Sequence, residues 1–393
     1  MSTQAIAIST KARQRYLLAL LFAGFSLTGL EITLAGPLLP TFISRWSLSD
    51  SRAGIFFTLQ YSCSLAGVWL ASLITHYLGN RFALLLGYLV MGAGLATANS
   101  PDLHVAMFAL ALLGIGYGLV VPPTNLEVAG IGGARGAALV SLVNFAWGTG
   151  SFACPFLVLL ALKNQILTRM LFAFGVFGWL LSAGFIFAEF PESKRGGKKP
   201  ESAAGQTQAG LTATTILAAG FFLYVLIETS FGGWAAAHAK RLSGTASGVS
   251  ILAPMFFYGG LMAGRAFAPF VLARVQEFRL VLCALGVAIA GGTCFLLARS
   301  QNEAFLFVAV TGIGCAVIFP VYVTWLSRWY GPSASKMRGL MFSMASVGSA
   351  AGPGLVGFVS QHAGGLRAGL LVPLVAAVIM GFLLLGVRRQ ATA

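Results

Sequence analysis

Long apolar segments recur along almost the whole chain and leave few options for its fold. Each holds roughly 20 residues with few charges, the length a helix needs to cross a hydrocarbon core about 30 Å thick. Of the 393 residues, 58% are hydrophobic and only 9% are charged, whereas a soluble domain carries roughly 25% charged residues. We therefore expect an all-α membrane protein. Twelve transmembrane helices are predicted at 16–40, 53–75, 82–99, 104–129, 137–160, 169–189, 211–235, 249–271, 279–298, 304–328, 339–360 and 367–387.

The basic residues predict how these helices are oriented in the membrane. Lys and Arg number 25 against 10 Asp and Glu, but they stand singly or in short runs and form no face suited to nucleic acid. Sixteen of them fall on the side of both termini and eight on the opposite side. The positive-inside rule then places both termini in the cytoplasm, and we expect a multi-pass protein of the bacterial inner membrane.

One polar, Gly-rich and basic stretch, 191–210, interrupts the apolar pattern. We expect a flexible cytoplasmic linker there, with a six-helix bundle before it at 1–190 and another after it at 211–393. A Gly-Ile-Gly and a proline recur at identical spacing in the fourth and tenth segments, at 114–122 and 312–320. This match favours a duplicated six-helix unit, as found in transporters built from internal repeats.

The six-plus-six layout, the basic central linker and the matched segments resemble the major facilitator superfamily over essentially the whole chain. The resemblance implies the major facilitator fold, two pseudo-symmetric bundles of six helices. Within the superfamily, the chain is most similar to the fucose/galactose/glucose proton symporters and the glucose-transporter-like branch. The features that carry this likeness are Asn125, the Ile-Phe-Pro segment at 318–320 and the Glu-Thr-Ser-Phe-Gly-Gly-Trp segment at 228–234.

Three arginines are candidates for gating or for a charge pair. The superfamily's Gly-x-x-x-Asp-Arg-x-Gly-Arg-Arg loop is degraded here at 72–81, although Arg81 still matches, which puts the gate latched by that loop in question. Arg135 precedes the fifth segment and is close in sequence to Glu127. Arg265 falls inside the eighth segment, where it either snorkels to the cytoplasm or pairs with an intramembrane glutamate.

Three of the ten acidic residues, Glu31, Glu127 and Glu228, fall inside predicted helices. A carboxylate at membrane depth is unfavourable by about 3 kcal/mol, so it persists when it is protonated, paired or facing a wet cavity. The three lie in segments 1, 4 and 7, which line the central cavity in the superfamily that the chain resembles. We expect proton coupling at Glu31 first, then at Glu228, with Glu127 as a third candidate. The plainer alternative is that each glutamate caps a kinked helix or pairs with an arginine.

A sugar site needs planar hydrogen-bonding groups for hydroxyls and aromatic faces for C–H surfaces, set in a mostly apolar pocket. Asn144 and Trp147 lie three residues apart on one helix face. Buried asparagines also bond to neighbouring helices, and tryptophans also anchor at the interface, so a structural role stays open. The candidate substrate-binding residues are Gln60, Asn125, Asn144, Trp147, Trp234, Tyr258, Tyr322 and Trp325.

Sequence signatures of enzymes are missing from the chain. It contains no H-E-x-x-H, G-x-S-x-G, Walker lysine loop or dinucleotide fingerprint, and its five cysteines form no C-x-x-C pair. We therefore expect no enzyme activity, no metal and no cofactor. The linker is too short to hold a nucleotide-binding domain, so transport must draw its energy from an ion gradient or from the solute's own gradient.

Taken together, these features predict a secondary active transporter that takes up a small polar solute such as a hexose with protons, by alternating access. We expect a monomer embedded in the lipid bilayer. Two other functions on the same fold stay open: a proton-antiporting exporter of amphipathic compounds and a facilitative sugar uniporter. A membrane-embedded enzyme or a sensor would need a clustered nucleophile or metal set, which the sequence does not display.

Overall fold

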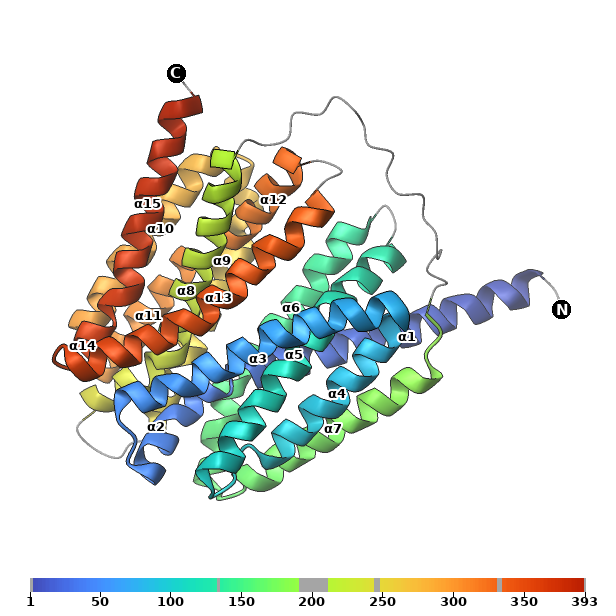
Figure 1. Cartoon of the computed structure of the whole chain (residues 1–393), viewed down its shortest axis with the longest axis horizontal. Helices are drawn as coiled ribbons and strands as arrows, with labels where there is room; N and C mark the ends of the chain where they lie inside the picture. Colours follow the sequence, from blue (N-terminus) through green and yellow to red (C-terminus); the bar gives the residue numbers. More distant parts are fainter. Residues whose placement is uncertain (1–2, 133–134, 191–210, 244–247, 331–333, 392–393) are drawn as a thin grey trace. The chain divides into compact units, whose positions relative to one another are not determined.

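The computed structural model of the protein describes residues 3–132, 135–190, 211–243, 248–330 and 334–391 (Figure 1). Throughout these ranges the chain forms helices joined by short turns, and they contain no strand. Twelve helical stretches are long and apolar enough to cross a membrane, which confirms the twelve predicted spans to within several residues at most ends. The predicted linker at 191–210 lies outside the described residues.

The chain divides into two compact units, of which the first comprises Met1–Leu34 and Ser62–Gly197. Within it, the third and fourth predicted spans pack against each other, and the first span packs against the fifth. Its helices are α1 (Thr3–Thr33), the second part of α3 (Asp50–Tyr77), α4 (Asn80–Thr97), α5 (Leu103–Gly132), α6 (Gly136–Lys163) and α7 (Leu167–Phe187).

The second unit comprises Ala35–Tyr61 and Lys198–Ala393. Its helices are α2 (Ala35–Trp46), the first part of α3, α8 (Leu211–Leu242), the 3₁₀ turn η2 (Gly248–Leu252), α9 (Ala253–Leu272), α10 (Glu277–Leu297), α11 (Gln301–Cys315), α12 (Ile318–Tyr330), α13 (Ala334–His362), α14 (Leu366–Gly369) and α15 (Leu371–Ala391). In this unit α8 packs against α13, α15 and α2, and α11 packs against α9 and α10.

Polar contacts tie α2 and the start of α3 to helices that follow the linker in sequence. The Asp50 carboxylate accepts hydrogen bonds from the side chains of Arg241 on α8 and Ser360 on α13. About two turns further along α3, the Thr58 hydroxyl donates to the carbonyl of Ala350 on α13 at 2.9 Å. The boundaries between the two compact units therefore fall after Leu34 and after Tyr61, as well as near the linker.

Two predicted spans are built from two helices each. Between α1 and α2 the Leu34 amide donates to the Glu31 carbonyl at 3.1 Å, a tight turn that ends α1. Pro37 follows, and because proline has no N–H, the carbonyl four residues earlier loses its helical partner. Between α11 and α12 the Ala316 amide donates to the Ile313 carbonyl in the same way, at 3.2 Å, and Pro320 is the third residue of α12, as Pro37 is of α2. A proline thus follows each of the two breaks.

Equivalent glycines make equivalent contacts in the two units. A β-carbon on Gly116 of α5 would lie 2.9 Å from the Gly87 carbonyl oxygen of α4. A β-carbon on Gly314 of α11 would lie 2.8 Å from the Ala284 carbonyl oxygen of α10. Both glycines are the third residue of the repeated Gly-Ile-Gly and allow two helix backbones to approach closely. This agreement supports the duplication inferred from the sequence.

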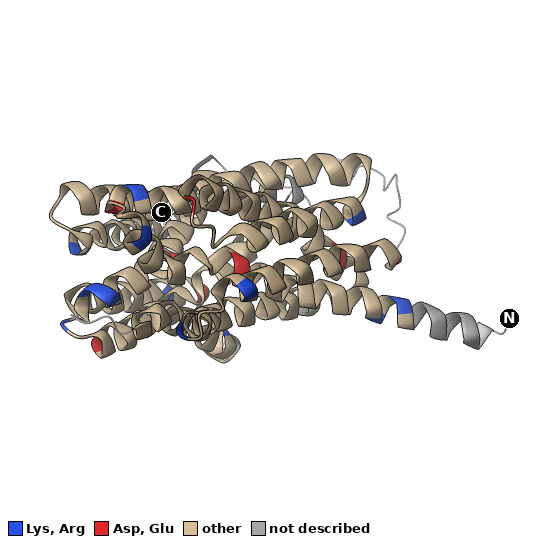
Figure 2. Ribbon diagram, turned by 90° about the horizontal axis from the view of Figure 1, so that it is seen from below, with Lys and Arg blue, Asp and Glu red and all other residues tan. Residues whose placement is uncertain are grey.

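Charged residues are sparse along the helices. In Figure 2 most of the ribbon is uncharged, and most Lys and Arg lie toward the helix ends. The acidic residue Glu31 does not follow this pattern, because its side chain is completely buried inside the first span.

Candidate functional site

Glu31 lies on α1 two residues before the break that separates α1 from α2. Its residue exposure is 0%, and Cys154 of α6 lies within electrostatic range of its carboxyl group and beside Thr33. The Thr33 hydroxyl donates back to the Gly29 carbonyl at 2.9 Å. The first unit therefore places an acidic group next to an interrupted helix, a combination that transporters use at solute and ion sites.

Close packing of α1 and α6 fixes the position of Glu31. The Ser151 hydroxyl of α6 donates to the Gly29 carbonyl of α1 at 3.0 Å. Gly29 faces the backbone of Trp147, and Gly150 faces the backbone of Ser26, so closely that neither has room for a β-carbon. Gly29 and Gly150 therefore allow the backbones of α1 and α6 to approach closely.

Two asparagines from neighbouring helices form a pair in the first unit. The Asn144 amide on α6 donates to the Asn125 side-chain oxygen on α5 at 3.0 Å. Asn144 is exposed and Asn125 half-buried, and Trp147 follows Asn144 by about one turn of α6. The structure therefore brings together three of the predicted substrate-binding residues, although the Asn pair also satisfies the structural alternative of an interhelical bond.

Glu127 lies near the end of α5 and accepts a hydrogen bond from the Asn80 amide at 2.7 Å. Asn80 begins α4, immediately before Arg81, whose guanidinium donates to the Ile186 carbonyl at the end of α7. Arg135 is exposed at the start of α6. The degraded loop therefore still makes side-chain contacts, with Asn80 bonded to the nearby carboxyl group.

A second polar cluster surrounds Glu228 in the second unit. Tyr224 lies one turn before Glu228 on α8, and Arg265 of α9 lies within electrostatic range of both side chains. Cys315, the last residue of α11, is also in range of Glu228 and Arg265. Each broken span thus has a glutamate nearby, Glu31 beside the α1–α2 break and Glu228 beside the α11–α12 break.

Sequence reasoning missed Tyr224 and Cys315 as members of this cluster. The signal for Tyr224 was present, because residues four apart face each other on a helix and Tyr224 precedes Glu228 by four. No local signal identified Cys315, which reaches the cluster only through the packing of α11 against α8 and α9. Asn80 was missed in the same way, since its partner Glu127 lies 47 residues away.

The remaining predicted substrate residues lie in the second unit, mostly buried. Gln60 of α3 and Trp234 of α8 both have 0% exposure. The Trp234 indole donates to the Pro353 carbonyl at 3.0 Å and packs against Phe57. Tyr258 of α9 packs closely against Gly232 of α8.

The two aromatic candidates of the tenth span are Tyr322 and Trp325. Tyr322 packs against Gly220 of α8, and its ring lies 5.2 Å from that of Trp325. The Trp325 indole donates to the Glu277 carboxylate at 2.8 Å. Trp325 is therefore directed toward a cavity at the end of the second unit, described below.

Metal-binding side chains do not gather in the part of the chain that the structure describes: no group of three or more His, Cys, Asp or Glu is placed to hold an ion there.

Comparison with known proteins adds two curated relatives, while no family model matches the chain. The sodium-dependent glucose transporter 1A of Mus musculus is 22% identical over 383 residues, which cover 87% of this chain and 89% of the relative. The sodium-dependent glucose transporter 1 of Homo sapiens is 23% identical over 421 residues, which cover 95% of this chain and 79% of the relative.

Solved structures match over nearly the full chain. A bacterial homologue of the human lysosomal transporter Spinster superposes with a TM-score of 0.75 at 14% identity, covering 95% of this chain and 96% of that one. The D-xylose-proton symporter gives 0.74 at 17% identity, covering 93% and 96%. The fucose:proton symporter of E. coli gives 0.62 at 14% identity, covering 93% and 97%.

The helices and these superpositions define a multi-pass membrane protein with the architecture of secondary transporters. The fucose:proton symporter is described as a major facilitator superfamily transporter. The chain has the major facilitator fold, as the sequence resemblance implied.

Proposed function

We propose that this protein is a secondary transporter that takes up a small polar solute of the hexose class together with protons, by alternating access. The observation that carries the proposal is the buried carboxyl group of Glu31 beside a broken transmembrane helix. A buried carboxylate is unfavourable unless it binds a proton or a compensating group. The backbone carbonyl that loses its helical N–H partner at Pro37 offers a second polar group at the same place.

The solute class is supported by the amide and indole groups of the first unit. Asn125 and Asn144 present side-chain donors and acceptors, and Trp147 offers an apolar ring nearby on α6. Such groups suit sugar hydroxyls and C–H faces respectively. The names of the relatives and of the matching structures, which mention glucose, xylose and fucose, agree with this class.

In the proposed cycle, Glu31 takes up a proton on the outer side while the solute binds. After the conformational change, both leave to the cytoplasm. The cluster around Glu228 acts second, because neutralising Glu228 weakens its attraction to Arg265 and so links protonation to helix position. The names of the curated relatives make sodium the chief alternative coupling ion.

The decisive experiment measures radiolabelled glucose, xylose and fucose uptake in proteoliposomes under a pH gradient, a sodium gradient or no gradient. Wild-type protein is compared with Glu31→Gln and with Glu189→Gln, a control in which the altered carboxylate is exposed and paired with Arg13. We expect Glu31→Gln to lose accumulation driven by the pH gradient and to keep counterflow exchange. The control should accumulate solute like wild type.

Other outcomes of these measurements would contradict the role of Glu31 or support a different transport function. Equal accumulation by wild type and Glu31→Gln contradicts the coupling role of Glu31. Accumulation that follows the sodium gradient alone replaces the proton by sodium, and equilibration without accumulation under any gradient indicates a uniporter. Thermal stabilisation by hydrophobic cations, without stabilisation by sugars, favours the proton-antiporting exporter.

The cellular setting remains part of the proposal: a monomer in the bacterial inner membrane, with both termini in the cytoplasm. Reporter fusions at each terminus, one type active only in the cytoplasm and one only outside it, test the orientation. Activity of the outside reporter at either terminus contradicts it.

A further inference from the structure

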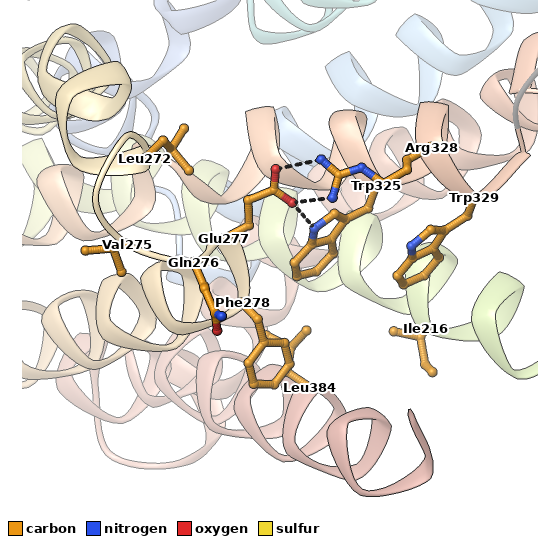
Figure 3. Close-up of a pocket in the computed structure, with 10 residues that line it drawn as sticks. All are labelled: Ile216, Leu272, Val275, Gln276, Glu277, Phe278, Trp325, Arg328, Trp329 and Leu384. Atoms are coloured by element: carbon orange, nitrogen blue, oxygen red, sulfur yellow. Dashed lines mark hydrogen bonds and ion pairs between the residues drawn. The ribbon is translucent and has the colours of Figure 1, made fainter. Parts of the chain in front are cut away.

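A cavity of about 570 Å³ opens at one end of the second unit (Figure 3). The starts of α8 and α10 and the ends of α9, α12 and α15 surround it. Most of its wall is apolar, with Ile216, Leu272, Phe278 and Leu384 among the contributors. The volume is in the range of sites for small organic molecules. Trp325, a predicted substrate-binding residue, lines this cavity, whereas Glu31, Asn125 and Asn144 do not.

One ion pair stands at the polar side of this cavity. The guanidinium of Arg328 binds the Glu277 carboxylate through two nitrogens, at 3.0 and 2.9 Å, and the Trp325 indole donates to the same carboxylate at 2.8 Å. A guanidinium has five N–H donors, so three of those of Arg328 are not used by Glu277. The pair therefore holds Arg328 in a fixed orientation with donors left for an anion.

Two indole rings lie beside the ion pair. Trp325 and Trp329 are nearly parallel, with ring centroids 5.8 Å apart and an interplanar angle of 5°. Tryptophan is enriched at the membrane–water interface because one part of the ring system is apolar and the N–H is polar. The paired indoles mark this wall as one suited to the boundary between lipid headgroups and acyl chains.

The charge around the cavity is positive. Arg274 and Arg279 are exposed on either side of the α9–α10 turn, and with Arg328 they outnumber Glu277 by three charges to one. This is also the end of the helices that the Lys and Arg distribution predicts to be cytoplasmic. The cytoplasmic leaflet is the anionic one in many membranes, and basic pockets between helices there attract lipid headgroups.

We propose that this cavity binds an anionic phospholipid, with the phosphate at Arg328 and the first acyl carbons against the Trp325, Trp329 and Leu384 wall. The apolar lining favours a lipid over a soluble phosphate compound, which would leave that surface exposed to water. The bound lipid bridges α8, α10, α12 and α15 at one end of the unit and so stabilises their packing.

The test uses delipidated full-length protein in detergent, titrated with phosphatidylglycerol or with zwitterionic phosphatidylcholine and followed by native mass spectrometry. The informative variant is Glu277→Gln/Arg328→Gln, which removes the guanidinium without leaving an unpaired carboxylate. The matched control is Arg299→Gln, an exposed arginine at the opposite end of the same unit. A second readout is quenching of tryptophan fluorescence by phosphatidylglycerol with brominated acyl chains, compared between wild type and Trp329→Phe.

We expect wild type and Arg299→Gln to prefer phosphatidylglycerol, and the double variant to bind it about fivefold more weakly. Quenching by the brominated lipid should decrease in Trp329→Phe. The proposal is overturned if phosphatidylcholine binds as well as phosphatidylglycerol, if the double variant binds like wild type, or if quenching does not change. Displacement of the lipid by millimolar inorganic phosphate also overturns it, because the site would then serve a soluble anion.

Discussion

The side-chain amide of Asn80 donates a hydrogen bond to the Glu127 carboxyl group at 2.7 Å, and so joins the start of α4 to the end of α5. Asn80 stands next to Arg81 in the loop that is degraded relative to the superfamily pattern. Arg81 in turn donates to the Ile186 carbonyl. The loop thus connects three helices of the first unit through side chains that its poor match to the family motif did not indicate.

Loss of the Asn80 donor should destabilise the first unit. We expect Asn80→Ala and Glu127→Ala each to lower stability by about 1–3 kcal/mol, because each leaves a half-buried polar group without its partner. Glu127→Gln keeps an acceptor oxygen and should cost much less. Thermal unfolding in detergent measures all three, and equal losses in Glu127→Gln and Glu127→Ala would show that the charge, rather than the hydrogen bond, matters. Normal gradient-driven uptake by a stable Glu127→Gln would exclude Glu127 from proton coupling.

Helix packing beside Glu31 should be sensitive to single methyl groups. Gly150 has no room for a β-carbon because the Ser26 carbonyl of α1 lies against it. We expect Gly150→Ala to destabilise the protein by about 1–3 kcal/mol through overpacking. Gly130 on α5 has open space around it, so Gly130→Ala is the matched control and should be neutral or slightly stabilising. Comparable loss of thermal stability in both variants would contradict the close approach of α1 and α6.

Glu228 and Arg265 should be energetically coupled. Removing one charge leaves the other in apolar surroundings. The stability losses of Glu228→Gln and Arg265→Gln should therefore add up to more than the loss in the double variant. A double-mutant cycle on thermal or denaturant stability should give a coupling free energy on the order of 1–3 kcal/mol. Tyr224→Phe is the third variant, and it should reduce this coupling if the hydroxyl belongs to the cluster. If the effects of the two substitutions on stability are additive, Arg265 does not pair with Glu228 and instead extends toward the membrane surface.

Trp234 and Trp147 should behave differently although both were candidates for solute contact. Trp234→Phe removes the indole donor to the Pro353 carbonyl, and we expect a stability loss of about 1–3 kcal/mol with an unchanged half-saturating solute concentration. Trp147→Phe should instead raise the half-saturating concentration in uptake assays, because Trp147 lies on the helix face of Asn144. A raised half-saturating concentration in Trp234→Phe would contradict this expectation and indicate that Trp234 contacts the solute.

Much of the fold was predictable because bilayer thickness imposes a length on every apolar segment. The predicted span at 249–271, for example, corresponds to the stretch Gly248–Ala268. The first span was predicted shorter than it is, since it continues through α2 to Trp46. Its last part, from Thr41 to Trp46, contains Ser44 and Arg45, and in the structure α2 packs against α8 and stacks two of its rings on Phe56 of α3.

The candidate site was predictable in its residue types and only partly in its geometry. The intramembrane glutamates can be recognised in this sequence, because so few charges interrupt its apolar segments. Prolines in an apolar segment indicate a possible helix break. Pro37 and Pro320 follow such a break, whereas α6 and α13 continue through Pro155 and Pro353. Whether a proline breaks a helix depends on neighbouring helices that stabilise the freed backbone groups, and those neighbours are distant in sequence.

Sequence reasoning alone predicted twelve membrane-spanning helices, suggested that the two halves are related, and indicated that Glu31 needs a partner or a proton. These conclusions follow from the cost of placing polar groups in hydrocarbon, which acts on each segment separately. The folded structure was needed to bring Cys154 within electrostatic range of Glu31, to bond Asn80 to Glu127 and to place Arg328 and two tryptophans at a cavity. Contacts of this kind depend on how helices pack, and packing is set by the shapes of side chains far apart in the chain.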